Sequence, residues 1–210
     1  MGRLVNGING PIQGKVGAVV GSSWKGIPYI KAAYKKRTKN ISNKELENRR
    51  KFALSQEFLQ PLLEVVRVGF KDFSPRSEGF VAAKSHLLLH AMEGEGADRV
   101  INPALVKISH GDLPLSGNIS VSLTEPGRLQ FTWDTAYVEG GHNRDQVLLL
   151  AYDVDKGLAS HILYGQFRFT GADQLAIASG SGYTYHLYLA FIAHDRSRQS
   201  HSKYLGSIST

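Results

Sequence analysis

The chain has 210 residues, no cysteine and a formal net charge of +7. Hydrophobic residues make up 42% of the sequence, which supports a packed core and excludes wholesale disorder. The absence of cysteine excludes disulfides, zinc–thiolate sites, cysteine-ligated iron–sulfur clusters and a thiol nucleophile.

The positive charge is concentrated near the N-terminus. Residues 1–51 hold twelve Lys and Arg against two Glu, a net of +10. The remaining 159 residues hold thirteen basic and sixteen acidic side chains, a net of −3. A basic N-terminal arm is typical of proteins that bind nucleic acid, and it also suits a solvated face or a docking surface for an acidic neighbour.

The first residues, "MGRLVNGINGPIQGKVG", lack the unbroken apolar stretch and the small-residue cleavage site of a signal peptide. No run approaches the ~20 apolar residues that a spanning helix needs. Asn6 breaks the myristoylation pattern. We therefore expect a soluble protein made in the cytoplasm, without a membrane span, that could end up in a virion.

The stretch from Gly14 to Tyr34 predicts a β-hairpin arm. The segments "KVGAVVGSSW" and "IPYIKAAY" flank Lys25-Gly26, where the glycine can supply the positive φ of a tight turn. Pro28 cannot donate to a ladder, so the second strand should lie at a sheet edge. Because an isolated hairpin is marginally stable in water, this one must pack on the rest of the chain or on a neighbouring copy.

The next segment predicts two helices. Ser42 and Glu45 fit a capping box after the basic connector "KKRTKN", and an apolar face continues to about Val68. Pro61 should kink or split this helix because it has no backbone N–H. A shorter helix is expected over residues 80–92, "FVAAKSHLLLHAM".

From Val100 onward, short alternating segments with turn signals between them predict an antiparallel β-sandwich. The strands should lie in "NISVSL", "RLQFTW", "DQVLLLAYDV", "ASHILYGQFRF", "DQLAIAS", "YTYHLYLAFIA" and "SKYLGSI". The fold class is thus mixed and mainly β. The expected domains are a hairpin arm (1–41), a helical segment (42–99) and a sandwich (100–210).

Residues 104–210 resemble a fibronectin type III-like or immunoglobulin-like sandwich. Trp133 ends the second strand of the pattern, and Tyr185 lies in the long penultimate strand, where such domains often place a tyrosine corner. The resemblance implies that both side chains belong to the sandwich core.

The N-terminal part is similar to a module of phage and prophage structural proteins. That module has a glycine-rich hairpin with a W-K-G-x-x-Y core, followed by basic residues and a helix with Arg and Phe near its start. The matching positions are Trp24, Lys25, Gly26, Tyr29, Lys31, Arg50 and Phe52. This chain has "NISNKEL" where the module usually has NP-x-T-x-x-Q. The whole layout resembles an uncharacterised family of Bacteroidota with no known activity.

Motifs for catalysis are missing from the sequence. The pattern G-x-x-x-x-G-K-[ST] is not met, and no G-x-S-x-G elbow occurs. His86 and His90 stand four apart on the second predicted helix, and "DVDKG" at Asp153–Gly157 reads as a turn rather than a calcium loop. The loops 140–145 and 194–201 are polar enough to bind a ligand. We expect no catalytic residue, metal, cofactor or small-molecule substrate.

Two interpretations of the arm remain. In the first, an apolar set buries against a neighbouring subunit: Trp24, Ile27, Tyr29, Ile30 and Tyr34. In the second, a basic set contacts the phosphates of nucleic acid: Lys25, Lys31, Lys35, Lys36, Arg37, Lys39, Arg49 and Arg50.

The sequence therefore predicts a non-enzymatic structural protein, a virion-associated component of a phage or prophage that self-associates or docks through its arm. The alternatives are a DNA-binding protein that uses the basic arm and a protein-binding adaptor that uses sandwich loops around His142 and Arg144.

Overall fold

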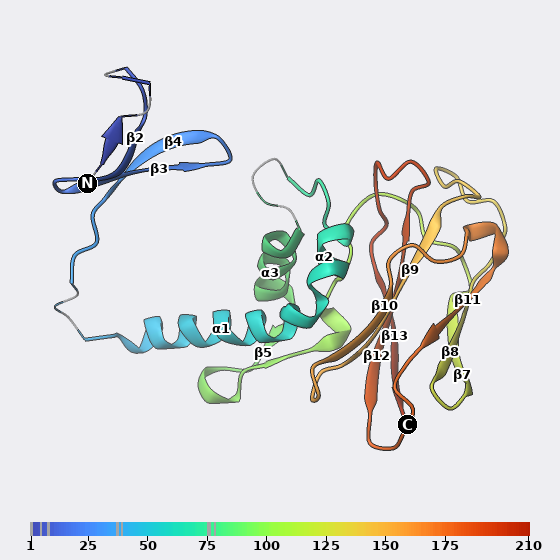
Figure 1. Cartoon of the computed structure of the whole chain (residues 1–210). Helices are drawn as coiled ribbons and strands as arrows, with labels where there is room; N and C mark the ends of the chain where they lie inside the picture. Colours follow the sequence, from blue (N-terminus) through green and yellow to red (C-terminus); the bar gives the residue numbers. More distant parts are fainter. Residues whose placement is uncertain are drawn as a thin grey trace. The chain divides into compact units, whose positions relative to one another are not determined.

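The computed structural model describes residues 2–4, 6–7, 9–36, 38, 40–74, 77 and 79–210. The chain divides into two compact units, residues 1–42 and 43–210. Figure 1 shows the strands of the first unit in blue, and the helices and sandwich of the second unit in cyan to red. No helix in the described part of the chain is long and apolar enough to cross a bilayer.

The first unit is a four-stranded antiparallel sheet in the order β1-β2-β3-β4. Its strands are β1 (Arg3–Leu4), β2 (Ile12–Val16), β3 (Val19–Trp24) and β4 (Ile27–Ala32). Lys25 and Gly26 form the turn between β3 and β4 with φ values of 48° and 81°, as a two-residue turn of type I′ requires. The predicted hairpin is therefore present, with β4 at the sheet edge.

The segment "KVGAVVGSSW" before this turn does not form one strand. Residues 15 and 16 belong to β2, and Gly17 adopts a φ of +57° that starts a second tight turn before β3. A glycine is favoured there because a side chain would be strained at that φ. The result is a meander with two successive hairpins.

The second unit begins with a helical layer. It consists of α1 (Asn43–Leu59), the 3₁₀ turn η1 (Gln60–Leu62), α2 (Leu63–Gly69) and α3 (Gly79–His90). Pro61 lies in η1 and splits the first predicted helix, as its missing N–H demands. The second predicted helix is present as α3, but it ends at His90 because Met92 pairs with Ile101 in a small hairpin.

The predicted β-sandwich is confirmed, and all its strand pairs are antiparallel. One sheet has the order β11-β8-β7 and the other β10-β9-β12-β13. The first comprises β7 (Ser120–Glu125), β8 (Arg128–Thr132) and β11 (Ala172–Ala176), and the second comprises β9 (Gln146–Asp153), β10 (Leu158–Ile162), β12 (Thr184–Ile192) and β13 (Lys203–Ser209). The short hairpin of β5 (Met92–Glu93) and β6 (Val100–Ile101) and three further 3₁₀ turns complete the chain: η2 (Gly96–Asp98), η3 (Pro103–Leu105) and η4 (Arg168–Thr170).

The second unit has three layers, because the helices cover the outer face of the four-stranded sheet (Figure 1). Leu148, Leu150 and Tyr188 face the helices, whereas Leu149 and Leu189 face the three-stranded sheet. Every residue of β9 after Gln146 is buried. A strand buried on both sides reads as a continuous apolar run, and each fully buried large side chain contributes about 1.5–3 kcal/mol.

Candidate functional site

The first sheet has one face made of uncharged residues. Side chains that are directly paired across neighbouring strands lie on the same face. Val16 pairs with Val19, Val19 pairs with Ala32, and Ile30 lies two residues before Ala32 on β4. We call this the aliphatic face and define it as Val16, Val19, Pro28, Ile30 and Ala32. The side chains of Val16 and Ile30 are 48% and 60% exposed.

The opposite face of the same sheet combines aromatic and basic residues. We call it the cationic–aromatic face and define it as Lys15, Val20, Trp24, Ile27, Tyr29 and Lys31. The ammonium of Lys31 lies 6.0 Å from the ring centre of Tyr29, and that of Lys25, in the adjoining turn, lies 5.5 Å from Trp24. Cations at these distances are attracted to the aromatic rings.

Burial within the first sheet is almost absent. Among its described residues, Gly21 alone is buried, because the backbone of Ile12 crosses over it. A Cβ at Gly21 would lie 1.9 Å from the Ile12 carbonyl oxygen. A sheet that buries so little of its own surface gains little from the hydrophobic effect, so it depends on contacts outside itself.

The apolar residues predicted for the arm are all exposed, but they do not form one surface. Trp24, Ile27 and Tyr29 lie on the cationic–aromatic face, whereas Ile30 lies on the aliphatic face. Tyr34 follows β4 and is 88% exposed. The prediction grouped these side chains into one set because the sequence does not reveal the register of β3 and β4.

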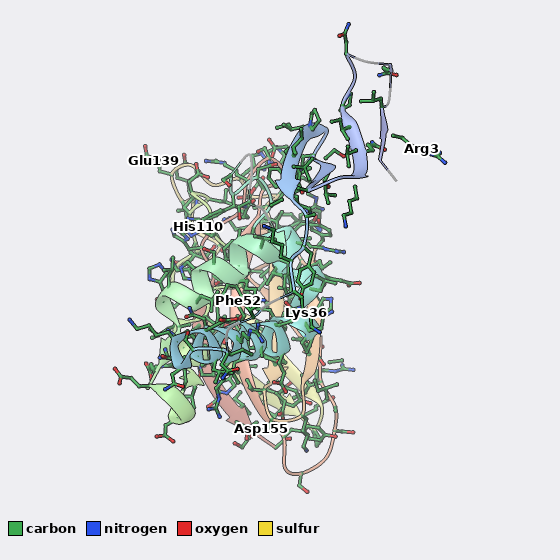
Figure 2. All side chains as sticks on the ribbon, turned by 90° about the vertical axis from the view of Figure 1, so that its left-hand side faces the viewer. Arg3, Lys36, Phe52, His110, Glu139 and Asp155 are labelled. Atoms are coloured by element: carbon green, nitrogen blue, oxygen red, sulfur yellow. The ribbon has the colours of Figure 1, made fainter. Side chains whose placement is uncertain are left out.

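The basic residues predicted for nucleic-acid contact lie in both units. Lys25 and Lys31 belong to the β3–β4 hairpin, and exposed Lys35 and Lys36 follow β4 (Figure 2 labels Lys36). Arg37 and Lys39 lie outside the described residues. Arg49 and Arg50 are on α1 in the second unit, and Arg49 forms an ion pair with Glu45 at 2.9 Å.

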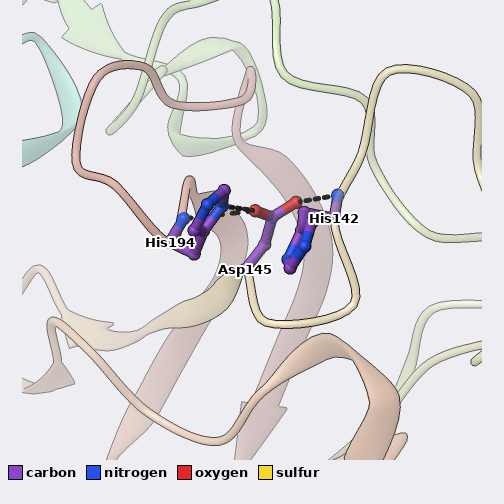
Figure 3. Close-up of side chains that lie close together, drawn as sticks. All are labelled: His142, Asp145 and His194. Carbon is purple, nitrogen blue, oxygen red and sulfur yellow. Dashed lines mark hydrogen bonds and ion pairs between the residues drawn. The ribbon is translucent and has the colours of Figure 1, made fainter.

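The fold brings the two polar loops singled out in the sequence together at one end of the sandwich. His142 and Asp145 come from the loop before β9, and His194 comes from the loop after β12 (Figure 3). Asp145 accepts backbone hydrogen bonds from His142 N to Oδ2 at 2.8 Å and from His194 N to Oδ1 at 3.2 Å. The two imidazole rings stack with centroids 4.1 Å apart. We call these three residues the loop triad.

Arg168 connects the loop triad to the interior of the sandwich. Its guanidinium lies 3.3 Å from Asp145 Oδ2, and it donates to Ser116 Oγ at 2.9 Å and to the Pro114 carbonyl at 2.8 Å. Burial lowers the pKa of Arg168, and the charge of Asp145 opposes that change. Trp133 donates from Nε1 to the Arg168 carbonyl at 2.8 Å.

The two residues predicted for the sandwich core are both buried. Trp133 is 5% exposed and Tyr185 is 0% exposed, and both lie in the cluster between the two sheets. The Trp133 ring makes an edge-on contact with Phe191 at 5.7 Å. Trp133 is thus also part of the support for Arg168.

Four histidines gather where α3 meets the sandwich: His86, His90, His110 and His201. The ring centroid of His86 lies 4.6 Å from that of His90 and 6.2 Å from that of His110. The rings of His110, which Figure 2 labels, and His201 are 4.5 Å apart. Burial lowers the pKa of His86 to about 4, helped by the charges of His90, Lys107, His110 and His201. Burial also lowers the pKa of His110 and of His201.

This histidine cluster should make the second unit sensitive to acid. As the pH falls below 6.5, the unfolded chain binds a proton at His86, whereas the folded chain does not bind it until about pH 4. The free energy of unfolding therefore falls across that window, by about 2 kcal/mol for this partly solvent-screened side chain. Urea unfolding of His86→Gln should show a smaller loss between about pH 8 and about pH 5 than the wild type. An identical loss in the variant would contradict the assignment.

Sequence reasoning did not bring Asp145, His194 and Arg168 together because these residues are far apart in the chain. Asp145 and His194 are 49 positions apart, and Arg168 contacts Pro114 across 54 positions. The one sequence signal was that both loops are polar. The turn at Asp153 is structural in the folded chain, since its carboxylate accepts from the backbone of Lys156 and of Thr184, both at 2.9 Å.

No curated protein matches the chain. The match to a family profile begins just before β2 and ends within β13. It therefore covers β2, β3 and β4 of the first unit and all of the second unit except its last four residues. With residues 11–206 matched, the chain belongs to a family of unknown function, DUF6266.

Proposed function

We propose that this is a non-enzymatic structural protein that self-associates through its first unit, with the aliphatic face buried against a second copy. One observation carries the proposal: a four-stranded sheet in which Gly21 is the one buried residue among those described. Such a sheet needs an external partner to bury apolar surface. The residues available for that burial include Val16 and Ile30, which are 48% and 60% exposed.

Charge favours a second copy as the occupant of this face. The aliphatic face has no charged residue, so two copies can meet there without repulsion in an isologous contact. Self-association through the opposite face would bring Lys15 and Lys31 of one copy against those of the other, which is unfavourable. The aliphatic face therefore suits a two-fold contact that leaves the basic side chains in solvent.

The setting that we propose is a phage or prophage particle. Its support is the resemblance of the Trp24, Lys25, Gly26 and Tyr29 pattern to the N-terminal modules of phage structural proteins. The strand orders β11-β8-β7 and β10-β9-β12-β13 support a fibronectin type III-like character for the displayed sandwich. In this view the first unit assembles and the second unit carries the sandwich.

The test compares two double variants of the full chain by light scattering coupled to gel filtration. Wild-type protein, freed of nucleic acid, should form oligomers that survive high salt. Val16→Lys with Ile30→Lys should give monomers, because charges on the aliphatic face cannot be buried. The matched control, Lys15→Ala with Lys31→Ala on the opposite face, should stay oligomeric. Monomeric wild-type protein, or equal effects of both double variants, would refute the proposal.

The cationic–aromatic face supports a second candidate function, the binding of single-stranded nucleic acid. Trp24 and Tyr29 are 47% and 42% exposed and each has a lysine ammonium within 6.0 Å of its ring. Stacking rings beside cations are the usual platform for single strands, with about 1–3 kcal/mol per stacked base. Here Lys15→Ala with Lys31→Ala should weaken binding to an oligodeoxynucleotide, and binding should weaken steeply with salt. No detectable binding at low salt would exclude this function.

A further inference from the structure

We infer that the loop triad is a binding site for a transition-metal ion of the Zn²⁺ type, with two imidazoles and one carboxylate as ligands. His142, Asp145 and His194 each offer a ligand atom, and these atoms all lie within 4.8 Å of one another. Within the described part of the chain, no other set of three such residues meets this condition. Two imidazoles with one carboxylate are a common donor set for these ions.

The distance between His194 and Asp145 requires only a small adjustment. His194 Nδ1 lies 3.8 Å from Asp145 Oδ1. Two ligands of a tetrahedral zinc ion, each about 2.0–2.1 Å from the metal, are roughly 3.3 Å apart. The carboxylate is fixed, with 1% of its side chain exposed, whereas the His194 side chain is 47% exposed and free to turn. The adjustment therefore falls on exposed imidazoles rather than on the core.

The environment of Asp145 prepares the carboxylate for coordination. Hydrogen bonds from His142 N and His194 N fix both oxygens, and Arg168 supports Oδ2 from the interior. Such outer contacts orient metal-binding carboxylates. The guanidinium charge disfavours hard cations that bind through charge alone, so the two imidazoles select Zn²⁺, Ni²⁺ or Cu²⁺ over Mg²⁺ or Ca²⁺.

Metal binding at His142 has a specific spectroscopic consequence. The Arg144 backbone N–H donates to His142 Nδ1 at 3.1 Å. A metal on Nδ1 would take that lone pair, and a metal on Nε2 would leave the ring proton on Nδ1. Either mode breaks the bond from Arg144. The backbone amide of Arg144 therefore reports on metal binding even though it is not a ligand.

The test is calorimetric titration of the full chain with ZnCl₂, together with an NMR titration that follows the Arg144 amide. We expect one ion per chain and a shift of that amide. His142→Ala and His194→Ala should each weaken binding by about tenfold or more. These variants are chosen over Asp145 because both imidazoles are exposed and their loss should leave the unfolding midpoint unchanged.

The matched control is His110→Ala, which removes an imidazole from the separate histidine cluster. It should bind Zn²⁺ as the wild type does. Three results would each overturn the inference: no binding of Zn²⁺ at any concentration that leaves the protein in solution, wild-type affinity in both triad variants, or loss of binding in His110→Ala, which would place the ion in the histidine cluster.

Discussion

Replacing Arg168 by methionine is expected to lower the free energy of unfolding by about 3–5 kcal/mol. The substitution leaves Asp145, which is 0% exposed, as a buried carboxylate without its cationic partner. It also removes the donors to Ser116 Oγ and to the Pro114 carbonyl. Urea unfolding, followed by tryptophan fluorescence from Trp133, should detect the loss, because this ring is hydrogen-bonded to Arg168.

The matched control is Arg128→Met on β8. The Arg128 side chain is exposed and donates a long hydrogen bond of 3.4 Å to Gln174, so we expect a change within about 0.5 kcal/mol. A loss of less than about 1 kcal/mol in Arg168→Met would show that the sandwich end is not held by this ion pair. Combining Arg168→Met with Asp145→Asn should cost less than the sum of the two single changes, because the groups are coupled.

The second large effect is expected from Gly69→Ala, at about 3 kcal/mol. A Cβ at this position would lie 2.1 Å from the Ile108 carbonyl oxygen and 2.9 Å from Ser109 Cα. Both atoms belong to the backbone, which can move away from a new Cβ only at a substantial cost in free energy. The Gly69 carbonyl also accepts a hydrogen bond from His110 N at 2.8 Å. The end of α2 and residues 108–110 are therefore held against each other.

Gly117→Ala provides the control for Gly69→Ala. Its Cβ would meet Asp134 at 3.7 Å, an ordinary contact distance, and the position is exposed. Chemical denaturation should therefore place the control within about 0.5 kcal/mol of the wild type. If Gly69→Ala also lies within that range, the close approach of α2 to residues 108–109 is not required for the fold.

Much of the fold could be predicted from local signals. The Lys25-Gly26 turn, the split at Pro61 and the seven strands of the sandwich each depend on residues close together in the sequence. The turn at Gly17 was missed because the apolar run through it reads as one strand. The covering of the four-stranded sheet by the helices was also missed, because an apolar run such as "VLLLAY" does not say what lies on each side of it.

The candidate sites were less predictable. The sequence located the exposed aromatic and basic residues of the arm, but the division into two faces follows from the pairing of β2, β3 and β4. The expectation of no metal depended on ligand spacing along the chain. His194 is brought to Asp145 by the β-sandwich topology, which spacing does not encode.

The burial of β9 and β12 on both faces limits where recombination between related genes can join coding segments without loss of the fold. Severing the chain near residue 100 would strip the cover from the outer face of the central sheet, which includes Leu148, Tyr152 and Ile192. A recombined gene that kept the sandwich and replaced the helices would have to supply an equally fitted cover at once. The tolerated crossover point is therefore near residue 42, where the first compact unit ends and the second begins. Recombination should therefore transfer the coding segment for residues 43–210 as a single unit.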